Sequence, residues 1–275
     1  MSQGIPAQQV GANLFARAHA CLGVCDPQLK VAATAQLARD FAAGAIDLCS
    51  HDAPLPIGAP GRPARPVLVA PRRLPQRGLG SVQGRIGLIH AVAHIEFNAI
   101  NLALDAVYRF RGMPAEYYRD WIGVAADEGR HFCLLSARLG ELGAAYGDLD
   151  AHDGLWEMAV KTSESCLTRM ALVPRVLEAR GLDVTPGMIA RVLAVGDTAT
   201  GGILELILRE EVAHVAAGSR WFAWCCAQSG CDPEATFAAL IAQHARHAVK
   251  GPFNVAARIA AGFSAAELKR LEAAA

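Results

Sequence analysis

The chain has 275 residues, a formal net charge of zero, 53% hydrophobic residues and 6% aromatic residues. A neutral chain lacks the strong basicity of a dedicated nucleic-acid binder. No run of 18 or more apolar residues occurs, and the opening Met-Ser-Gln-Gly-Ile-Pro lacks a basic stretch followed by an apolar core. We therefore expect a cytoplasmic protein without a membrane segment. The length is sufficient to bury a large core.

Residues 9–50 supply no candidate metal ligand. Residues 9–50 predict two helices, broken near Gly23–Pro27. Residues 52–80 hold seven of the fourteen prolines, which exclude regular helix and predict an extended strap. We assign residues 1–80 to accessory helices and strap, 81–230 to a four-helix core and 231–275 to C-terminal accessory helices, all within one compact domain.

The strap and the start of the next helix are locally basic. No acidic residue lies between Ala53 and Ile95, whereas this stretch contains Arg62, Arg65, Arg72, Arg73, Arg77 and Arg85. Such a stretch could hold an anionic substrate or a nucleic acid. The favoured alternative is that the arginines keep the strap soluble and pair with acidic helices.

The remaining chain predicts an all-α fold. The first two core helices are expected over Val82–Phe110 and Pro114–Leu142, with a turn at Arg111–Pro114 and a loop over Tyr146–Gly154. A third is expected over Thr162–Arg180, bent at Pro174, and a fourth over Thr198–Gln228. The stretch Gly181–Pro186 predicts an interruption, with Thr185 capping a further segment. Asp232-Pro233 opens another helix, and Ser264 caps a last short one.

Two copies of one metal-binding pattern occur within the predicted core. Each copy is a glutamate followed by a Glu-x-x-His pair: Glu96 with Glu128 and His131, then Glu178 with Glu211 and His214. Residues three apart lie about 60° apart around a helix axis, so both members of a pair can reach one ion. The set of four carboxylates and two imidazoles is the one that ferritin-like bundles use for two iron or manganese ions, and it neutralises two divalent cations.

The separation of the candidate ligands along the sequence supports a metal site more strongly than their number does. Glu96 and Glu128 are 32 residues apart, and Glu178 and Glu211 are 33 apart. In an antiparallel hairpin with arms of about 14 residues, at about 1.5 Å per residue, Glu128 returns to the level of Glu96. A single Glu-x-x-His would more often be a solvated pair. Both copies here lie within apolar stretches, 122–135 and 203–217, where an unpaired buried carboxylate would be costly.

Several other residues are secondary candidates. Asp127 and Glu210 each precede a Glu-x-x-His pair, and a metal-bound histidine usually gives its second ring N–H to a carboxylate. We therefore expect Asp127 to contact His214 and Glu210 to contact His131; the alternative is that both are ordinary exposed acids. His90 and His94 are poorly phased with Glu96, so packing or a supporting position is favoured over an additional ligand pair. Tyr117 and Trp121 share the face of Glu128, where packing is favoured over a channel or redox relay.

Longer segments carry a family resemblance. They are LIHAVAHIEFNAINLALDAVYRF, DWIGVAADEGRHF, AHDGLWEMA, MALVPRVLEARGLDVTP and EEVAHVAAGSRWF, spread between about Gln8 and Leu271. Through them the chain resembles an uncharacterised bacterial ferritin-like family, a domain of unknown function within the ferritin-like di-iron carboxylate superfamily. The family brings no established reaction. DEGRH is also similar to the Asp-Glu-x-Arg-His motif of di-iron oxygenases, from which the second copy departs at Glu210 and Ala213.

The favoured function is a non-haem di-iron carboxylate protein that uses dioxygen to oxidise or hydroxylate a small-molecule substrate. The sequence identifies neither the substrate nor the electron donor, leaves Mn/Fe and Mn/Mn centres open beside two Fe ions, and permits a homodimer. A ferroxidase or iron-storage protein ranks second, because storage shells use bare bundles much shorter than this chain. A third alternative is a bundle with a purely structural metal site.

Overall fold

The computed structural model describes residues 13–49, 52–75, 77–245 and 248–274, and this part of the chain is all-helical. The N-terminal helices are α1 (Leu14–Gly23) and α2 (Pro27–Ala42), followed by the 3-10 turn η1 (Pro71–Arg73) in the strap. The central elements are α3 (Val82–Arg109), α4 (Ala115–Glu141), α5 (Gly154–Lys161), α6 (Cys166–Leu172), the π-helical turn η2 (Val173–Glu178), α7 (Ala179–Ala194) and α8 (Thr198–Ser229). The C-terminal elements are α9 (Pro233–Leu240), the π-helical turn η3 (Ile241–Ala245), α10 (Val255–Ala260) and α11 (Ala265–Ala274). Within the described ranges, the strand-like pairing consists of one isolated bridge, Leu68 with Ala151.

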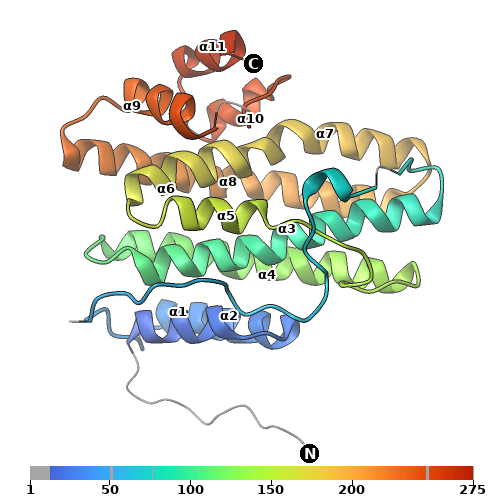
Figure 1. Ribbon diagram of the computed structural model, residues 1–275, viewed down its shortest axis with the longest axis horizontal. Coiled ribbons are helices and arrows are strands. Elements are labelled where there is room, and N and C mark those ends of the chain that lie inside the picture. Colours follow the sequence, from blue (N-terminus) through green and yellow to red (C-terminus); the bar gives the residue numbers. More distant parts are fainter. Residues whose placement is uncertain (1–12, 50–51, 76, 246–247, 275) are drawn as a thin grey trace, which may run out of the picture.

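The long helices lie side by side in the middle of the molecule (Figure 1). Helix α3 packs along α4, α4 also contacts α8, and α8 packs against the run α6–η2–α7. Helices α1 and α2 cover α3 and α4 on one side, and the C-terminal helices cover α6–α8 on the opposite side (Figure 1). The residues around 96, 128, 178 and 211 therefore lie in the interior layer.

Helix α3 is the most deeply embedded element. It starts after Ser81, whose hydroxyl accepts a hydrogen bond from the Gly84 N–H at 3.1 Å. By length and composition it could cross a membrane, but 78% of its most apolar window is buried inside the protein. Helix α3 therefore has the burial expected for the core helix of a soluble protein.

Some strap arginines form ion pairs with described acidic residues, and others are exposed. Arg62 pairs with Asp153 at 2.6 Å, and Arg85 lies 3.4 Å from Asp197, the residue that caps α8. These two contacts agree with the favoured interpretation that strap arginines pair with acids at helix ends. Arg72 and Arg77 are exposed and form no ion pair with another described residue. Binding of an anion or nucleic acid to the strap stays the less favoured alternative, which these contacts do not test.

The expected third helix, Thr162–Arg180, is wrong in its boundaries. The loop after Tyr146 ends in a separate helix, α5, and a turn follows before Ser165 caps α6 by accepting from the Thr168 N–H at 3.1 Å. Pro174 does disturb the helix, as expected, and the disturbance is a full π-helical turn. Because proline has no N–H and its ring clashes with the carbonyl four residues earlier, a wider turn accommodates it.

The expected interruption at Gly181–Pro186 is also wrong, because α7 continues through Pro186. Pro186 cannot donate to the carbonyl of Leu182, which would lose its usual helical partner. The side-chain amide of Asn254 donates to that carbonyl at 3.2 Å. A residue far along the sequence thus compensates for the proline, and Thr185 lies inside the helix instead of capping one.

Candidate metal centre

Five of the six expected ligands form two clusters in the interior, Glu96 with Glu128 and His131, and Glu128 with Glu211 and His214, and Glu178 belongs to neither. Glu96 lies in the middle of α3, Glu178 ends η2, and the Glu-x-x-His pairs lie on α4 and α8. The exposed fraction is 5% for Glu96, 1% for Glu128, 0% for His131 and 3% for His214. Such burial of carboxylates and imidazoles is costly unless they pair with one another or bind an ion.

The first half of the site joins α3 and α4. His131 Nδ1 lies 3.1 Å from Glu96 Oε2 and 3.3 Å from Glu128 Oε2. One ligand atom from each of these three residues lies within 4.8 Å of the others. This cluster could hold a metal ion.

The second half joins α4 and α8. His214 Nδ1 lies 3.0 Å from Glu128 Oε1 and 3.1 Å from Glu211 Oε2. These three residues form a second group whose ligand atoms lie within 4.8 Å of one another. The two oxygens of Glu128 thus face different histidines, whose ring centroids are 5.9 Å apart. The sequence spacing did not reveal that one carboxylate is shared by both halves.

Glu178 differs from the other five candidate ligands in its hydrogen bonding. Its Oε2 atom is buried and has no hydrogen-bond partner in the described part of the chain. Burial, followed by the charges of Glu211 and Glu128, raises the pKa of Glu178 well above its usual value. The carboxylate is therefore near the second half, with an unsatisfied oxygen.

The outer nitrogens of both imidazoles meet the two expected acids. His131 Nε2 lies 2.7 Å from Glu210 Oε2, and His214 Nε2 lies 3.4 Å from Asp127 Oδ2. Sequence reasoning missed Arg130, which donates to Glu210 at 2.6 Å and to Asp127 at 2.9 Å. One arginine thus serves both acids, and the second copy of the pattern, with Ala213 at the equivalent position, needs no arginine of its own.

The protonation of the buried groups is strongly coupled. Burial lowers the pKa of His131, but contacts with Glu128 and Glu96 outweigh it and raise that pKa to about 10. Burial opposes ionisation of Glu128, yet its contacts with both histidines hold its pKa well below the usual value. Burial and the Glu128 charge raise the pKa of Glu96 and of Glu211. The cluster therefore balances negative carboxylates with protons when no ion neutralises them.

The two additional histidines of α3 are not part of this cluster. His90 Nε2 accepts from the Gly147 N–H at 3.0 Å, and His94 lies 2.9 Å from the Tyr146 hydroxyl and 3.0 Å from the His152 carbonyl. Both hold the loop after α4 against α3, which agrees with the packing interpretation. The helix phasing relative to Glu96 was sufficient to predict this outcome.

The aromatic candidates are packed in the core. Tyr117 is fully buried, and its ring centroid lies 6.3 Å from that of Trp121 and 5.2 Å from that of Trp221. A pocket of about 500 Å³ lies among the strap, α3, the loop after α4 and α7, where it is lined by residues such as Leu79, Leu88 and Arg191. No residue of the metal cluster lines that pocket.

Comparison with known proteins identifies the family. Residues 23–269 match the model of a family described as "Protein of unknown function (DUF455)". An uncharacterized protein of Haemophilus influenzae is 44% identical over 213 residues, which cover 75% of this chain and 74% of that protein. No solved structure matches the chain. With nearly its whole length matched, the chain belongs to the DUF455 family.

Proposed function

We propose that this member of the DUF455 family is a non-haem di-metal carboxylate protein, with two iron ions held in a ferritin-like four-helix bundle. The bundle consists of α3, α4, the run α6–η2–α7, and α8. The observation that carries the proposal is the position of Glu128, whose two oxygens face two separate Glu/His groups at 3.3 and 3.0 Å. A carboxylate shared in this way is suited to bridge two ions.

The donor set fits two metal ions on three further grounds. Both imidazoles turn Nδ1 toward the carboxylates and Nε2 toward an outer acid, which is how a metal-bound histidine is normally oriented. Glu178 has a buried oxygen without a partner, which an ion would satisfy. Four carboxylates also balance the charge of two divalent ions.

The candidate ligands would be distributed between the two ions as follows. Glu96 and His131 would hold one ion, Glu178, Glu211 and His214 the other, and Glu128 both. Glu210 and Asp127 would fix the two imidazole rings, with Arg130 holding both acids in place. Glu96 and Glu128 are buried, so the helices around them exclude bulk water from these two carboxylates. Two bound ferrous ions would supply two of the four electrons that reduce dioxygen to water, and the organic substrate would supply the other two.

We further propose that the activity is that of an oxidase or hydroxylase acting on a small organic substrate. A carboxylate-rich ligand set stabilises higher oxidation states of iron, which such chemistry requires. The outer helices and the strap cover the central layer (Figure 1), and this cover would obstruct assembly into a storage shell. This is why iron storage remains the second alternative.

The experiment is loading with ferrous ion followed by exposure to dioxygen. Apo-protein is loaded anaerobically with two ferrous ions per chain, and dioxygen uptake and the optical spectrum are recorded on mixing. We expect stoichiometric uptake without accumulation of mineral. A second sample receives a tenfold excess of ferrous ion in air; tight retention of iron far above two per chain, in a large closed shell, would contradict the oxidase proposal and favour storage.

A further inference from the structure

The turn that carries Glu178 has an unusual conformation. Residues Val173–Glu178 form a π-helical turn between the two α-helices α6 and α7. A turn of this kind holds an extra residue compared with an α-helix, so it rotates the residues before and after it by about 100° relative to one another. The direction of the Glu178 side chain therefore depends on this turn.

The turn fits into a gap on α8. A methyl group added at Gly218 would overlap Cβ and Cγ of the Pro174 ring. Gly218 itself is buried on α8, four residues after the candidate ligand His214. The absence of a side chain at 218 is therefore what lets the Pro174 ring lie against the helix that carries Glu211 and His214.

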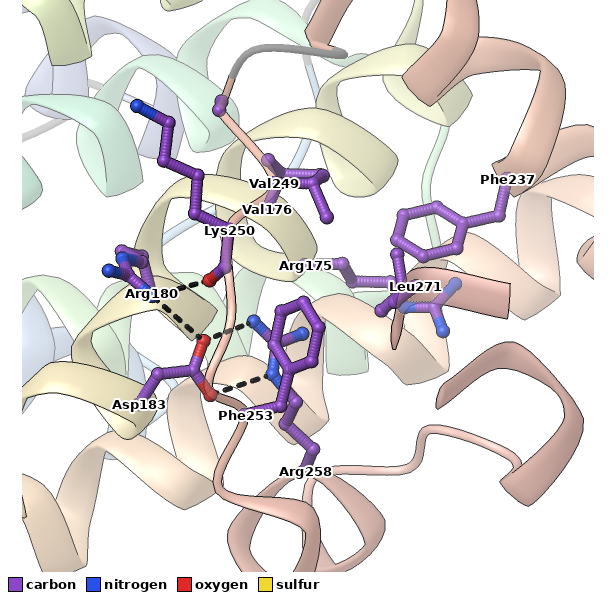
Figure 2. A pocket seen from close by; sticks show the side chains of 11 residues that line it. Arg175, Val176, Arg180, Asp183, Phe237, Val249, Lys250, Phe253, Arg258 and Leu271 are labelled. Carbon is purple, nitrogen blue, oxygen red and sulfur yellow. Dashed lines mark hydrogen bonds and ion pairs between the residues drawn. The ribbon is translucent and has the colours of Figure 1, made fainter. Parts of the chain in front are cut away.

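The C-terminal helices hold the turn from its other side. Arg175 is 3% exposed and donates to Glu267 Oε1 on α11 at 2.8 Å. Its guanidinium lies 4.1 Å from the ring centroid of Phe237 and 4.5 Å from that of Phe263. Figure 2 shows Arg175 beside Phe237 and Leu271, close to the ion pair between Asp183 and Arg258.

We propose that this π-helical turn, fitted onto Gly218 by Pro174 and anchored by Arg175, is a positioning element that places the Glu178 carboxylate at the Glu211/His214 half of the metal centre. Its positioning residues are Pro174, Arg175 and Gly218. The inference rests on the proposed function, because it assigns a metal-binding consequence to the turn.

The test is anaerobic titration of the apo-protein with cobalt(II), followed by its optical absorption. Wild-type protein should bind two ions. In Gly218→Ala the added methyl displaces the Pro174 ring, so we expect one ion to remain and the other to bind at least about tenfold more weakly. Adding Glu96→Ala, which removes a ligand of the other half, should then weaken the remaining ion.

A second variant separates positioning from folding. Pro174→Ala adds an N–H that can bond to the Met170 carbonyl, so the turn can relax toward an α-helix, and the new hydrogen bond and the higher helix propensity of alanine offset the lost packing of the Pro174 ring on α8. We expect unchanged or increased thermal stability together with about tenfold weaker binding of one cobalt ion. A merely structural role for the turn would not combine these two results.

The matched control is Gly202→Ala, also on α8, where an added Cβ meets no atom within 4 Å. It should bind two cobalt ions with wild-type affinity. If Gly218→Ala does not fold, the cobalt affinity of Pro174→Ala tests the positioning role by itself. Wild-type affinity for both ions in Pro174→Ala would overturn the positioning role while leaving the metal centre intact. Fewer than two ions in the wild type would overturn the proposed function and the positioning role with it.

Discussion

At the scale of single residues, Glu128 is the side chain on which the proposed metal centre depends most. Its two oxygens face His131 and His214 at 3.3 and 3.0 Å, so it is the residue common to both candidate clusters. The other candidate ligands each belong to one half. Loss of Glu128 should therefore affect both ions, and loss of Glu96 should affect one.

The first prediction compares these two changes. Glu128→Ala should abolish tight binding of both ferrous ions, whereas Glu96→Ala should retain one, as measured by metal content after anaerobic loading and desalting. Glu205→Ala, at an exposed position of α8, is the matched control and should retain two. Retention of both ions by Glu128→Ala at wild-type affinity would exclude its bridging role.

The second prediction ranks the acids behind the histidines. The His131 to Glu210 contact is 2.7 Å, whereas the His214 to Asp127 contact is 3.4 Å. Glu210→Gln should therefore weaken metal affinity more than Asp127→Asn, within the range of about 10 to 100-fold. Competition with a chelator measures both affinities, and circular dichroism should show an unchanged helix content. Equal affinities in wild type and both variants would contradict the supporting role.

The spacing of the glutamates and histidines along the sequence predicted most of the clustered residues. It did not predict which of these residues contact one another. The three-residue interval within each Glu-x-x-His pair and the matching 32- and 33-residue separations were sufficient to select the five side chains of the two clusters, whereas the metal-binding role of Glu178 stays a prediction. The bridging position of Glu128 was not predictable, because it depends on how α4 lies between α3 and α8. The double contact of Arg130 was hidden for the same reason, since its second partner is 80 residues away.

At the scale of helices, two of the departures from expectation occur at prolines. Helix propensity disfavours Pro174 and Pro186 strongly inside helices. One is accommodated by a π-helical turn on Gly218 and the other by the amide of Asn254. Both solutions involve residues distant in sequence, so local patterns could not reveal them. The starts of α2, α8 and α9 were recognisable, because Asp26, Asp197 and Asp232 cap them locally.

The third prediction tests the compensation at Pro186. Asn254→Ala removes the donor to the Leu182 carbonyl and the cap of α10, which should lower the free energy of unfolding by about 1 to 3 kcal/mol. In a Pro186→Ala background the new N–H can bond to that carbonyl, so the same change should cost about 1 kcal/mol less. Urea unfolding of the two single variants and the double variant measures this coupling. Strictly additive effects would contradict it.

The fourth prediction concerns the docking of the N-terminal helices. Lys30 of α2 is fully buried and donates to the Leu22 carbonyl of α1 at 2.8 Å and to Asn101 of α3. Burial lowers the pKa of Lys30 to about 7 from an ordinary value of 10.5. Between these two values the unfolded chain binds a proton that the folded chain does not, so stability should rise with pH in that window.

Urea unfolding at pH 7 and pH 9 checks the effect of Lys30. The free energy of unfolding of the wild type, relative to Lys30→Met, should increase by about 2 kcal/mol over these two pH units. Below pH 7 both states carry the proton, and the difference should level off. Parallel pH profiles for the two proteins would show that Lys30 keeps an ordinary pKa in the fold.

At the scale of the whole molecule, the three layers place the candidate metal cluster in the interior, where Glu96, Glu128, His131 and His214 are buried. Helices α1 and α2 cover one side of the central layer, and α9–α11 cover the other (Figure 1). The all-α class was predictable from the composition and the helical periodicity. The order of the layers depends on which helix faces pack together, which local sequence patterns do not specify.

The central claim is that two ions are bound in the interior of this fold, and anomalous X-ray diffraction at the iron edge tests it most directly. Crystals grown after anaerobic loading with ferrous ion should show two peaks about 3.5 to 4 Å apart. Both peaks should be bridged by Glu128, with Glu96 and His131 at one and Glu178, Glu211 and His214 at the other. An iron-loaded crystal with no peak among these six side chains would contradict the account.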